Sequence, residues 1–254
     1  MSTLLFNVGW TNIANIGDSR RPGQKLGSMC GRFSFFARRS DVAKAFPFVR
    51  ILDDFDALNP PRYNIAPTQT IPTISSEAPD AITPMHWGLV PYWAENPSIG
   101  NRMINARAES VAEKPAFRNA FRKGRRCLVL ADGYYEWAAT AEGKAPVRFV
   151  LRSGEPFAFA GLWERWYGDR DGPLTSATII TCPANDLSAR VHDRMPVILH
   201  RNDYHAWLDP GAPLELATSL LVPFPDAEMR AYAVSRLVNS PANDTPAVIA
   251  PIAA

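Results

Sequence analysis

The chain has few of the residues that build metal centres and disulfide frameworks. Its 254 residues include three cysteines and four histidines, and neither a Cys-x-x-Cys pair nor a His-Glu-x-x-His motif occurs. A zinc site is therefore not expected, and no metal or organic cofactor is implied. The scattered cysteines are typical of a reducing compartment, so a cytoplasmic protein is expected. Long apolar runs are also missing, and no membrane association is expected.

Charge of one sign is not in excess either. The formal net charge is +2 and 46% of residues are hydrophobic, so composition alone does not indicate a nucleic-acid binder. The 23 prolines favour many short elements joined by turns. We expect one α+β domain over residues 29–240, with a mixed, strongly bent, barrel-like sheet and short surrounding helices. Residues 1–28 are expected to be a flexible extension or a misassigned start before Met29, and residues 241–254 a loose tail.

Local patterns predict the elements of this domain. Apolar and aromatic runs predict strands at residues 30–36, 70–74, 82–90, 126–131, 175–181, 197–199 and 229–234. A hairpin is predicted between residues 147–152 and 157–163, around Ser153 and Gly154. Three prolines within residues 59–67 predict a stiff extended loop. Helices are predicted after Ser40, over 185–190, after Asn202 and near 214–221.

The stretch Met29-Cys30-Gly31-Arg32-Phe33 reads like the start of a protein. Removal of Met29 would leave Cys30 with an α-amine and a thiol on adjacent carbons, with ordinary pKa values of about 8 and about 8.5. Such a 1,2-aminothiol condenses with an aldehyde to a Schiff base, and the thiol then closes a thiazolidine ring. From this stretch alone, a small buried cysteine at the start of a strand is the competing interpretation.

A basic segment lies at residues 100–130. It holds eight lysines and arginines against two glutamates, on a chain whose remainder is acidic. This local excess of positive charge suits phosphate binding, although a run of charged residues more often forms the solvent-exposed face of a helix. The aromatic residues around 87–93 fit either core packing or an exposed platform for stacked bases.

Two single residues have the chemistry of acid–base groups. Glu136 lies among aromatic residues, and a partly desolvated carboxylate suits proton transfer, although strand alternation could equally turn it to solvent. His192 lies in a turn between elements, where functional residues concentrate, although a lone loop histidine is more often an ordinary surface residue.

Six motifs occur here in one order and carry a family resemblance. They are Met-Cys-Gly-Arg-Phe from Met29, Arg-Tyr-Asn-Ile-Ala-Pro from Arg62, Trp-Gly-Leu-Val-Pro from Trp87, Asn-Ala-Arg-Ala-Glu from Asn105, Asp-Gly-Tyr-Tyr-Glu-Trp from Asp132 and His-Asp-Arg-Met-Pro from His192. Together they resemble the SOS response-associated peptidase family, from Met29 to about Asn239. Members of that family form covalent crosslinks to abasic sites in single-stranded DNA.

The resemblance implies roles for particular residues. Cys30 would be the crosslinking nucleophile, Asn105 would hold the abasic sugar and the Cys30 backbone, Glu136 would shuttle the α-amine proton, and His192 would assist opening of the sugar ring. The implied DNA-binding residues are Arg32, Arg107 and Arg194 on phosphates, with Asn64, Pro67 and Trp93 in loops that wedge and stack around the lesion. The implied partner is single-stranded DNA containing abasic sites, bound by a monomer that is nucleoid-associated if bacterial.

Three functions stay open at this point. The first is an abasic-site crosslinking enzyme of the DNA damage response, with lyase chemistry as a competing outcome of its Schiff base. The second is a thiol peptidase that exposes Cys30 by autoproteolysis, with His192 or Glu136 as its base. The third is a non-covalent module for single-stranded or modified DNA. Aldehyde-dependent covalent attachment separates the first from the third, and peptide turnover in trans separates the second.

Overall fold

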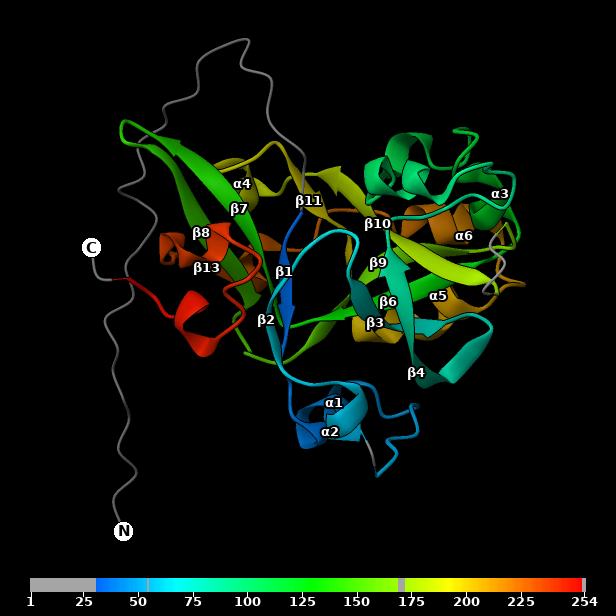
Figure 1. Ribbon diagram of the computed structural model, residues 1–254, viewed down its shortest axis with the longest axis horizontal. Helices are drawn as coiled ribbons and strands as arrows, with labels where there is room; N and C mark the ends of the chain where they lie inside the picture. The colour runs from blue at the N-terminus through cyan, green and yellow to red at the C-terminus, as the bar shows by residue number, and fades with distance from the viewer. Residues whose placement is uncertain (1–30, 54, 169–171, 253–254) are drawn as a thin grey trace.

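Two packed β-sheets with short helices around them form the fold (Figure 1). The computed structural model describes residues 31–53, 55–168 and 172–252. The first sheet has the strand order β13-β8-β7-β1-β2. Its strands are β1 (Phe33–Phe35), β2 (Arg62–Ile65), β7 (Gly133–Thr140), β8 (Gly143–Leu151) and β13 (Met229–Ala233).

The second sheet is a ring of strands. Its path runs β11-β10-β4-β3-β6-β9-β12, β9 also pairs with β10, and β5 joins the edge of β10. The strands are β3 (Thr70–Ser75), β4 (Ala78–Trp87), β5 (Asn105–Arg107), β6 (Arg126–Ala131), β9 (Phe157–Trp166), β10 (Leu174–Pro183), β11 (Arg194–Pro196) and β12 (Ile198–Leu199). Only two residue pairs join β4 to β10, so the ring is a bent sheet rather than a closed barrel. The predicted α+β fold with a mixed, bent sheet is confirmed.

Short helices cover the edges of the sheets. They are α1 (Arg39–Ala45), α2 (Phe55–Leu58), α3 (Arg118–Arg122), α4 (Asp186–Ala189), α5 (Tyr204–Leu208) and α6 (Leu214–Ser219). In Figure 1, α1 and α2 lie below β1, and α3 lies at the far end of the second sheet. No helix in the described ranges is both long and apolar enough to cross a membrane.

Phe33 carries β1 into the core between the sheets. It is fully buried, and its ring meets Trp87 of β4 at 5.1 Å and Phe159 of β9 at 5.8 Å between centroids, both edge to face. Burying an aromatic ring of this size contributes a few kcal/mol, so β1 is held firmly although it has only three residues. The chain that follows Cys30 therefore has a fixed position.

Three predictions about local structure were wrong. The predicted hairpin over 147–163 does not form, because β8 pairs with β7 and β13 whereas β9 pairs with β6, β10 and β12. The predicted loop over 59–67 contains β2, which pairs with β1 because Pro67 lies beyond its end. By contrast, the helix expected after Asn202 is confirmed: α5 begins at Tyr204, after a 3-10 turn.

The third wrong prediction is the expectation of a loose tail. Val248 is fully buried, and Pro251 bridges to Val234 beside β13. The apolar residues of this segment pack on the first sheet, so the segment belongs to the domain. Residues 1–30, with the expected extension and Cys30, lie outside the described residues.

Candidate active site

The first described residues run beside β7 at Glu136. The carbonyl oxygen of Arg32 accepts a hydrogen bond from the backbone N–H of Tyr135 at 3.0 Å, and Phe33 pairs with Tyr134 at the next position. Glu136 follows directly and is only 5% exposed. This burial excludes the alternative in which strand alternation turns Glu136 to solvent. The shielded carboxylate of Glu136 therefore lies one residue along β7 from Tyr135, which is hydrogen-bonded to the backbone of Arg32.

A buried ion pair supports this arrangement from within the first sheet. Asp132 Oδ1 accepts hydrogen bonds from Arg148 Nη2 at 3.0 Å and from Ser34 Oγ at 2.6 Å, and its Oδ2 accepts one from the N–H of Phe36 at 2.5 Å. Arg148 Nη1 also donates to Tyr232 Oη at 2.7 Å. Burial raises the pKa of Asp132 although Arg148 acts to lower it. The pair therefore fixes the C-terminal part of β1 through Ser34 and Phe36.

His192 is held as a neutral imidazole with one nitrogen unused. Its Nδ1 accepts a hydrogen bond from the backbone N–H of Arg194 at 3.1 Å, so the proton belongs on Nε2. Asp193 also lies 3.0 Å from Nδ1, but that contact is a hydrogen bond only if Nδ1 carries a proton. Burial lowers the pKa of His192, so we assign the neutral form. Among the described residues, its buried Nε2 has no hydrogen-bond partner.

A short chain of contacts joins His192 to β7. The His192 N–H donates to the carbonyl of Ser188 in α4 at 2.9 Å, and Ser188 Oγ lies 3.0 Å from Tyr134 Oη. Side chains of Tyr134 and Glu136 lie on the same face of β7, because residues two apart share a face. The fold thus brings the histidine turn against the strand that carries Glu136.

Asn105 and Arg194 lie on opposite sides of β10. Asn105 begins β5 opposite Ile179, and Arg194 begins β11 opposite Pro183. Arg194 makes a bidentate pair with Glu109 at 2.6 and 2.9 Å and donates to the carbonyl of Thr181 at 2.6 Å. Its guanidinium therefore ties β11 to β10 and to the turn after β5.

Arg32 and Asn64 meet the C-terminal segment. Arg32 Nη1 donates to Asn64 Oδ1 at 2.8 Å and to the Val238 carbonyl at 2.7 Å, and burial lowers its pKa. Asn64 is fully buried, and its Nδ2 donates to the carbonyls of Ser240 at 2.9 Å and Asn243 at 2.8 Å. The side-chain amide of Asn64 therefore makes its hydrogen bonds to other groups of the protein. No sequence pattern pointed to these carbonyl partners.

Asp244 completes the same junction. Its Oδ1 accepts hydrogen bonds from the backbone N–H groups of Tyr63 at 2.5 Å and Asn64 at 2.9 Å, and its Oδ2 pairs with Arg62. These donors lie in β2, so one carboxylate from the tail fixes the Arg-Tyr-Asn motif. A lone aspartate in a Pro- and Ala-rich tail carries no signal that would have identified it.

The remaining expected DNA contacts lie on the surface. Arg107 is exposed at the end of β5, and Trp93 is 48% exposed. Pro67 lies in the loop after β2, directly before Thr68, whose φ of 70° is unusual for a residue with a β-branched side chain. Exposure of Trp93 favours the stacking alternative for this residue, whereas Trp87 of the same stretch is buried in the core.

The basic segment divides into two kinds of residue. Arg126 is buried, stacks on Phe121 and Trp207, and donates to the Asp209 carbonyl at 3.0 Å. Arg125 pairs with the buried Glu164. These two guanidinium groups serve the fold, and the other six basic residues of the segment are exposed.

The two cysteines that the structure describes do not fit a nucleophile. Cys127 and Cys182 are both buried in strands. Burial raises the pKa of the Cys182 thiol to about 12 and that of Cys127 further still, so neither forms a thiolate near neutral pH. Within the described ranges, no three His, Cys, Asp or Glu side chains come together in a way that could hold a metal ion.

Comparisons with known proteins identify the family of this chain. The family model described as SOS response associated peptidase (SRAP) matches residues 29–241. Abasic site processing protein YoqW of Bacillus subtilis is 42% identical over 224 residues, which cover 87% of this chain and 99% of the relative. Abasic site processing protein HMCES of Gallus gallus is 32% identical over 226 residues, covering 76% and 66%.

A solved structure shares the fold. The crystal structure of a protein from Bacteroides thetaiotaomicron matches with a TM-score of 0.78 and 29% identity, over 88% of this chain and 100% of that one. The match of the family model extends over most of the chain and includes every motif that the sequence analysis singled out. The chain therefore belongs to the SOS response-associated peptidase family.

Proposed function

We propose that this protein processes abasic sites in DNA by binding single-stranded DNA and forming a thiazolidine with Cys30 as its N-terminal residue. The observation that carries the proposal is the hydrogen bond from Tyr135 to the Arg32 carbonyl, next to the buried Glu136. It holds the residues that follow Cys30 against a shielded carboxylate. Relatives named abasic site processing proteins support the choice of lesion.

The reaction needs an open-chain aldehyde and a neutral amine. His192 presents Nε2–H, which can donate a hydrogen bond to the ring oxygen of the deoxyribose as the ring opens. Glu136 accepts the proton that the α-ammonium group of Cys30 must lose. The amine nitrogen then adds to the aldehyde carbon, and loss of one water gives the Schiff base.

Ring closure decides the outcome of the Schiff base. The Cys30 sulfur adds to the imine carbon, its proton ends on the nitrogen, and the product is a five-membered thiazolidine. The net change is one water released for one C–N and one C–S bond formed. Without this closure, β-elimination of the 3′ phosphate would cut the strand, so thiol capture competes with lyase chemistry.

DNA is held without reading its sequence. We assign Arg107 as the most accessible phosphate contact, because it is exposed and makes no ion pair in the described part of the chain. Arg32 and Arg194 act beside it from positions fixed by Asn64 and Glu109. Asn105 holds the sugar, and Pro67 and Trp93 approach the bases next to the lesion.

Cys30 requires a free α-amine. Removal of Met29 after initiation there supplies it, as does cleavage of the bond before Cys30. Autocleavage of that bond would be the one peptidase reaction this scheme contains.

A denaturing gel tests the proposal. Protein that begins at Met29, with Cys30 verified as the mature N-terminus, is incubated with single-stranded DNA containing one abasic site. We expect an SDS-resistant adduct that is absent with intact DNA and with Cys30→Ala. The matched control inserts one glycine between Met29 and Cys30, which keeps the thiol but separates it from the α-amine. An adduct of unchanged yield in the glycine insertion would refute the aminothiol chemistry.

A further inference from the structure

A continuous groove lies along α3, and of the residues given a role in the proposed function it is lined by Trp93 alone. One hollow of about 590 Å³ is lined by residues of β9, the turn after β3 and the end of α3. A second, of about 410 Å³, lies between α3 and the loop around Trp93. Tyr92, Asn119 and Lys123 line both, so the two hollows form one groove, which we call the α3 groove.

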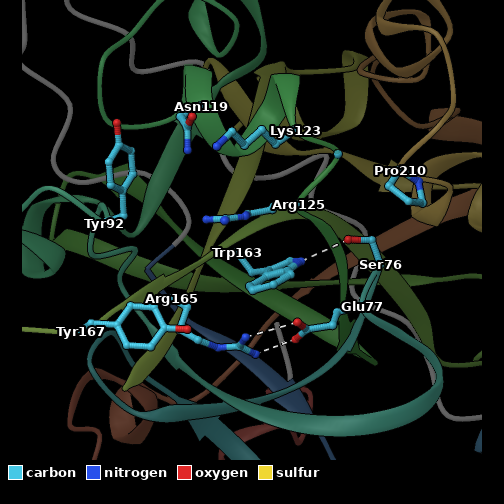
Figure 2. A pocket seen from close by; sticks show the side chains of 11 residues that line it. Ser76, Glu77, Tyr92, Asn119, Lys123, Arg125, Trp163, Arg165, Tyr167 and Pro210 are labelled. Carbon is cyan, nitrogen blue, oxygen red and sulfur yellow. Dashed lines mark hydrogen bonds and ion pairs between the residues drawn. The ribbon is translucent and has the colours of Figure 1, made fainter. Parts of the chain in front are cut away.

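The floor of the α3 groove is rigid. Trp163 is almost fully buried there, and its indole N–H donates to Ser76 Oγ at 3.2 Å. The guanidinium carbons of Arg125 and Arg165 lie 5.7 and 5.5 Å from the Trp163 ring. Figure 2 shows Arg165 extended toward Glu77, with which it makes a bidentate pair, while Lys123 enters the groove from α3.

Unpaired cations gather on one wall. Arg118, Arg122 and Lys123 line the groove and are exposed, and none forms an ion pair in the described part of the chain. Arg118 and Arg122 are four residues apart on one helix, so their side chains emerge about 5–6 Å from each other. Such a row can follow successive phosphates of one strand.

Exposed aromatic rings gather at the same groove. Three aromatic side chains in the described ranges are strongly exposed: Tyr92 at 55%, Trp93 at 48% and Tyr167 at 71%. All three line the α3 groove. Exposing one large ring needs no explanation, but three rings that converge on a row of free cations form the combination that holds single-stranded nucleic acid.

We infer that the α3 groove is a second nucleic-acid subsite, which holds the single strand that flanks the lesion through stacked bases and phosphates, without sequence preference. The inference rests on the proposed function for the identity of the polymer. The inference adds a second binding site to that function. In this site Tyr92 and Tyr167 are the stacking surfaces, and the phosphate contacts are Arg118, Arg122 and Lys123. Short lesion-bearing DNA would reach only the reaction centre, and longer DNA would reach both.

Binding without chemistry tests the subsite. Fluorescence anisotropy with intact single-stranded oligonucleotides of increasing length measures Kd across a salt series. We expect Arg122→Glu to weaken binding of long oligonucleotides and to reduce the salt slope by about 0.7, the value for one phosphate contact. Tyr92→Ala should weaken binding about fivefold or more, and Tyr92→Phe should retain it. Short oligonucleotides should bind all variants alike.

Arg152→Glu is the matched control, because Arg152 is an exposed arginine in a turn of the first sheet with no ion pair in the described residues. Equal losses in Arg122→Glu and Arg152→Glu would overturn the subsite, since only net charge would then matter. No loss in Tyr92→Ala would also overturn it, because binding would then depend only on the attraction between the basic side chains and the phosphates. Crosslinking is measured separately at saturating protein. If no adduct forms although the groove variants still weaken binding of long oligonucleotides, the proposed function is refuted and the subsite is not.

Discussion

The buried pair of Arg148 and Asp132 yields the sharpest test of how β1 is held. Replacing Arg148 by Met removes the counter-charge of a carboxylate that is only 8% exposed in its side chain, while filling much of the same volume. Breaking a buried pair from one side typically costs about 3–5 kcal/mol, because a charge is left uncompensated. For a chain of this size that corresponds to a fall in Tm of roughly 6–20 °C.

The matched surface control is Arg50→Met. Arg50 pairs with Asp80 at 2.8 Å, but the two side chains are 73% and 50% exposed, so the cost should stay below about 1 kcal/mol. Adding Asp132→Asn to Arg148→Met removes the unpaired charge and should recover roughly half of the loss. Equal costs for Arg148→Met and Arg50→Met, or no recovery in the double variant, would refute the account.

The pH dependence supplies an independent check. Burial already raises the pKa of Asp132, and loss of Arg148 should raise it further. The folded variant then keeps its proton at pH values where the unfolded chain, with a carboxyl pKa of about 3.9, has lost it. Its stability must fall as the pH rises above about 4, so the deficit relative to the wild type should grow between pH 4 and 7.

Three further predictions concern other parts of the site. Because the pKa of His192 is lowered in the folded state, the unfolded chain binds a proton on this residue at a higher pH than the folded chain does. The free energy of unfolding should therefore fall as the pH drops below about 6.5. In thermal melts from pH 7.5 to 5, the Tm of His192→Gln should fall less than that of the wild type. Asp244→Ala should cost about 2–4 kcal/mol in urea unfolding, since it leaves two N–H groups of β2 unpaired, and Asp244→Asn should cost less. Gly88→Ala should cost at least about 2 kcal/mol, because φ is 135° and the new Cβ would lie 2.6 Å from the Gly100 oxygen; equal destabilisation by Gly154→Ala, where no atom lies within 4 Å, would contradict this.

Local signals predicted local structure well. The apolar run at Arg126–Ala131 forms β6 with the predicted bounds, and all six of its residues are buried. Asn185 was expected to begin a helix, and its side chain accepts a hydrogen bond from the Ser188 N–H at 2.8 Å, as a helix N-cap does. Both signals act between residues close in sequence, which is why the sequence contains them.

Strand partners could not be predicted in the same way. Ser153 and Gly154 do form a turn, with Gly154 at a φ of 73°, but the strands on either side enter different sheets. A turn residue fixes the direction of the chain without specifying its partner. What separates β8 from β9 is the burial of apolar side chains against β13 and β10, which are distant in sequence.

The residues around the site show the same difference between what local sequence predicts and what distant partners decide. Motifs identified Arg32, Asn64 and Arg194. Arg32 and Asn64 are held by the carbonyls of Val238 and Asn243, which no motif contains, whereas Arg194 is held by Glu109, the last residue of another motif. A carbonyl oxygen carries no side-chain signal, so the sequence cannot announce it as a partner. Consequently, residues that look like DNA contacts in a motif can be structural ties first.

This division changes what substitutions at the motif arginines measure. Exchange of Arg194 removes two bonds to Glu109 and two to Thr181 together with any phosphate contact, so lost DNA binding alone would not identify its role. Glu109→Gln separates the two, because it weakens the tie and keeps the arginine. Arg107 makes no ion pair in the described chain and offers the cleaner case. If Arg107→Ala weakens DNA binding without lowering Tm, while Arg194→Ala lowers both, the two arginines have different duties although one pattern of motifs identified them.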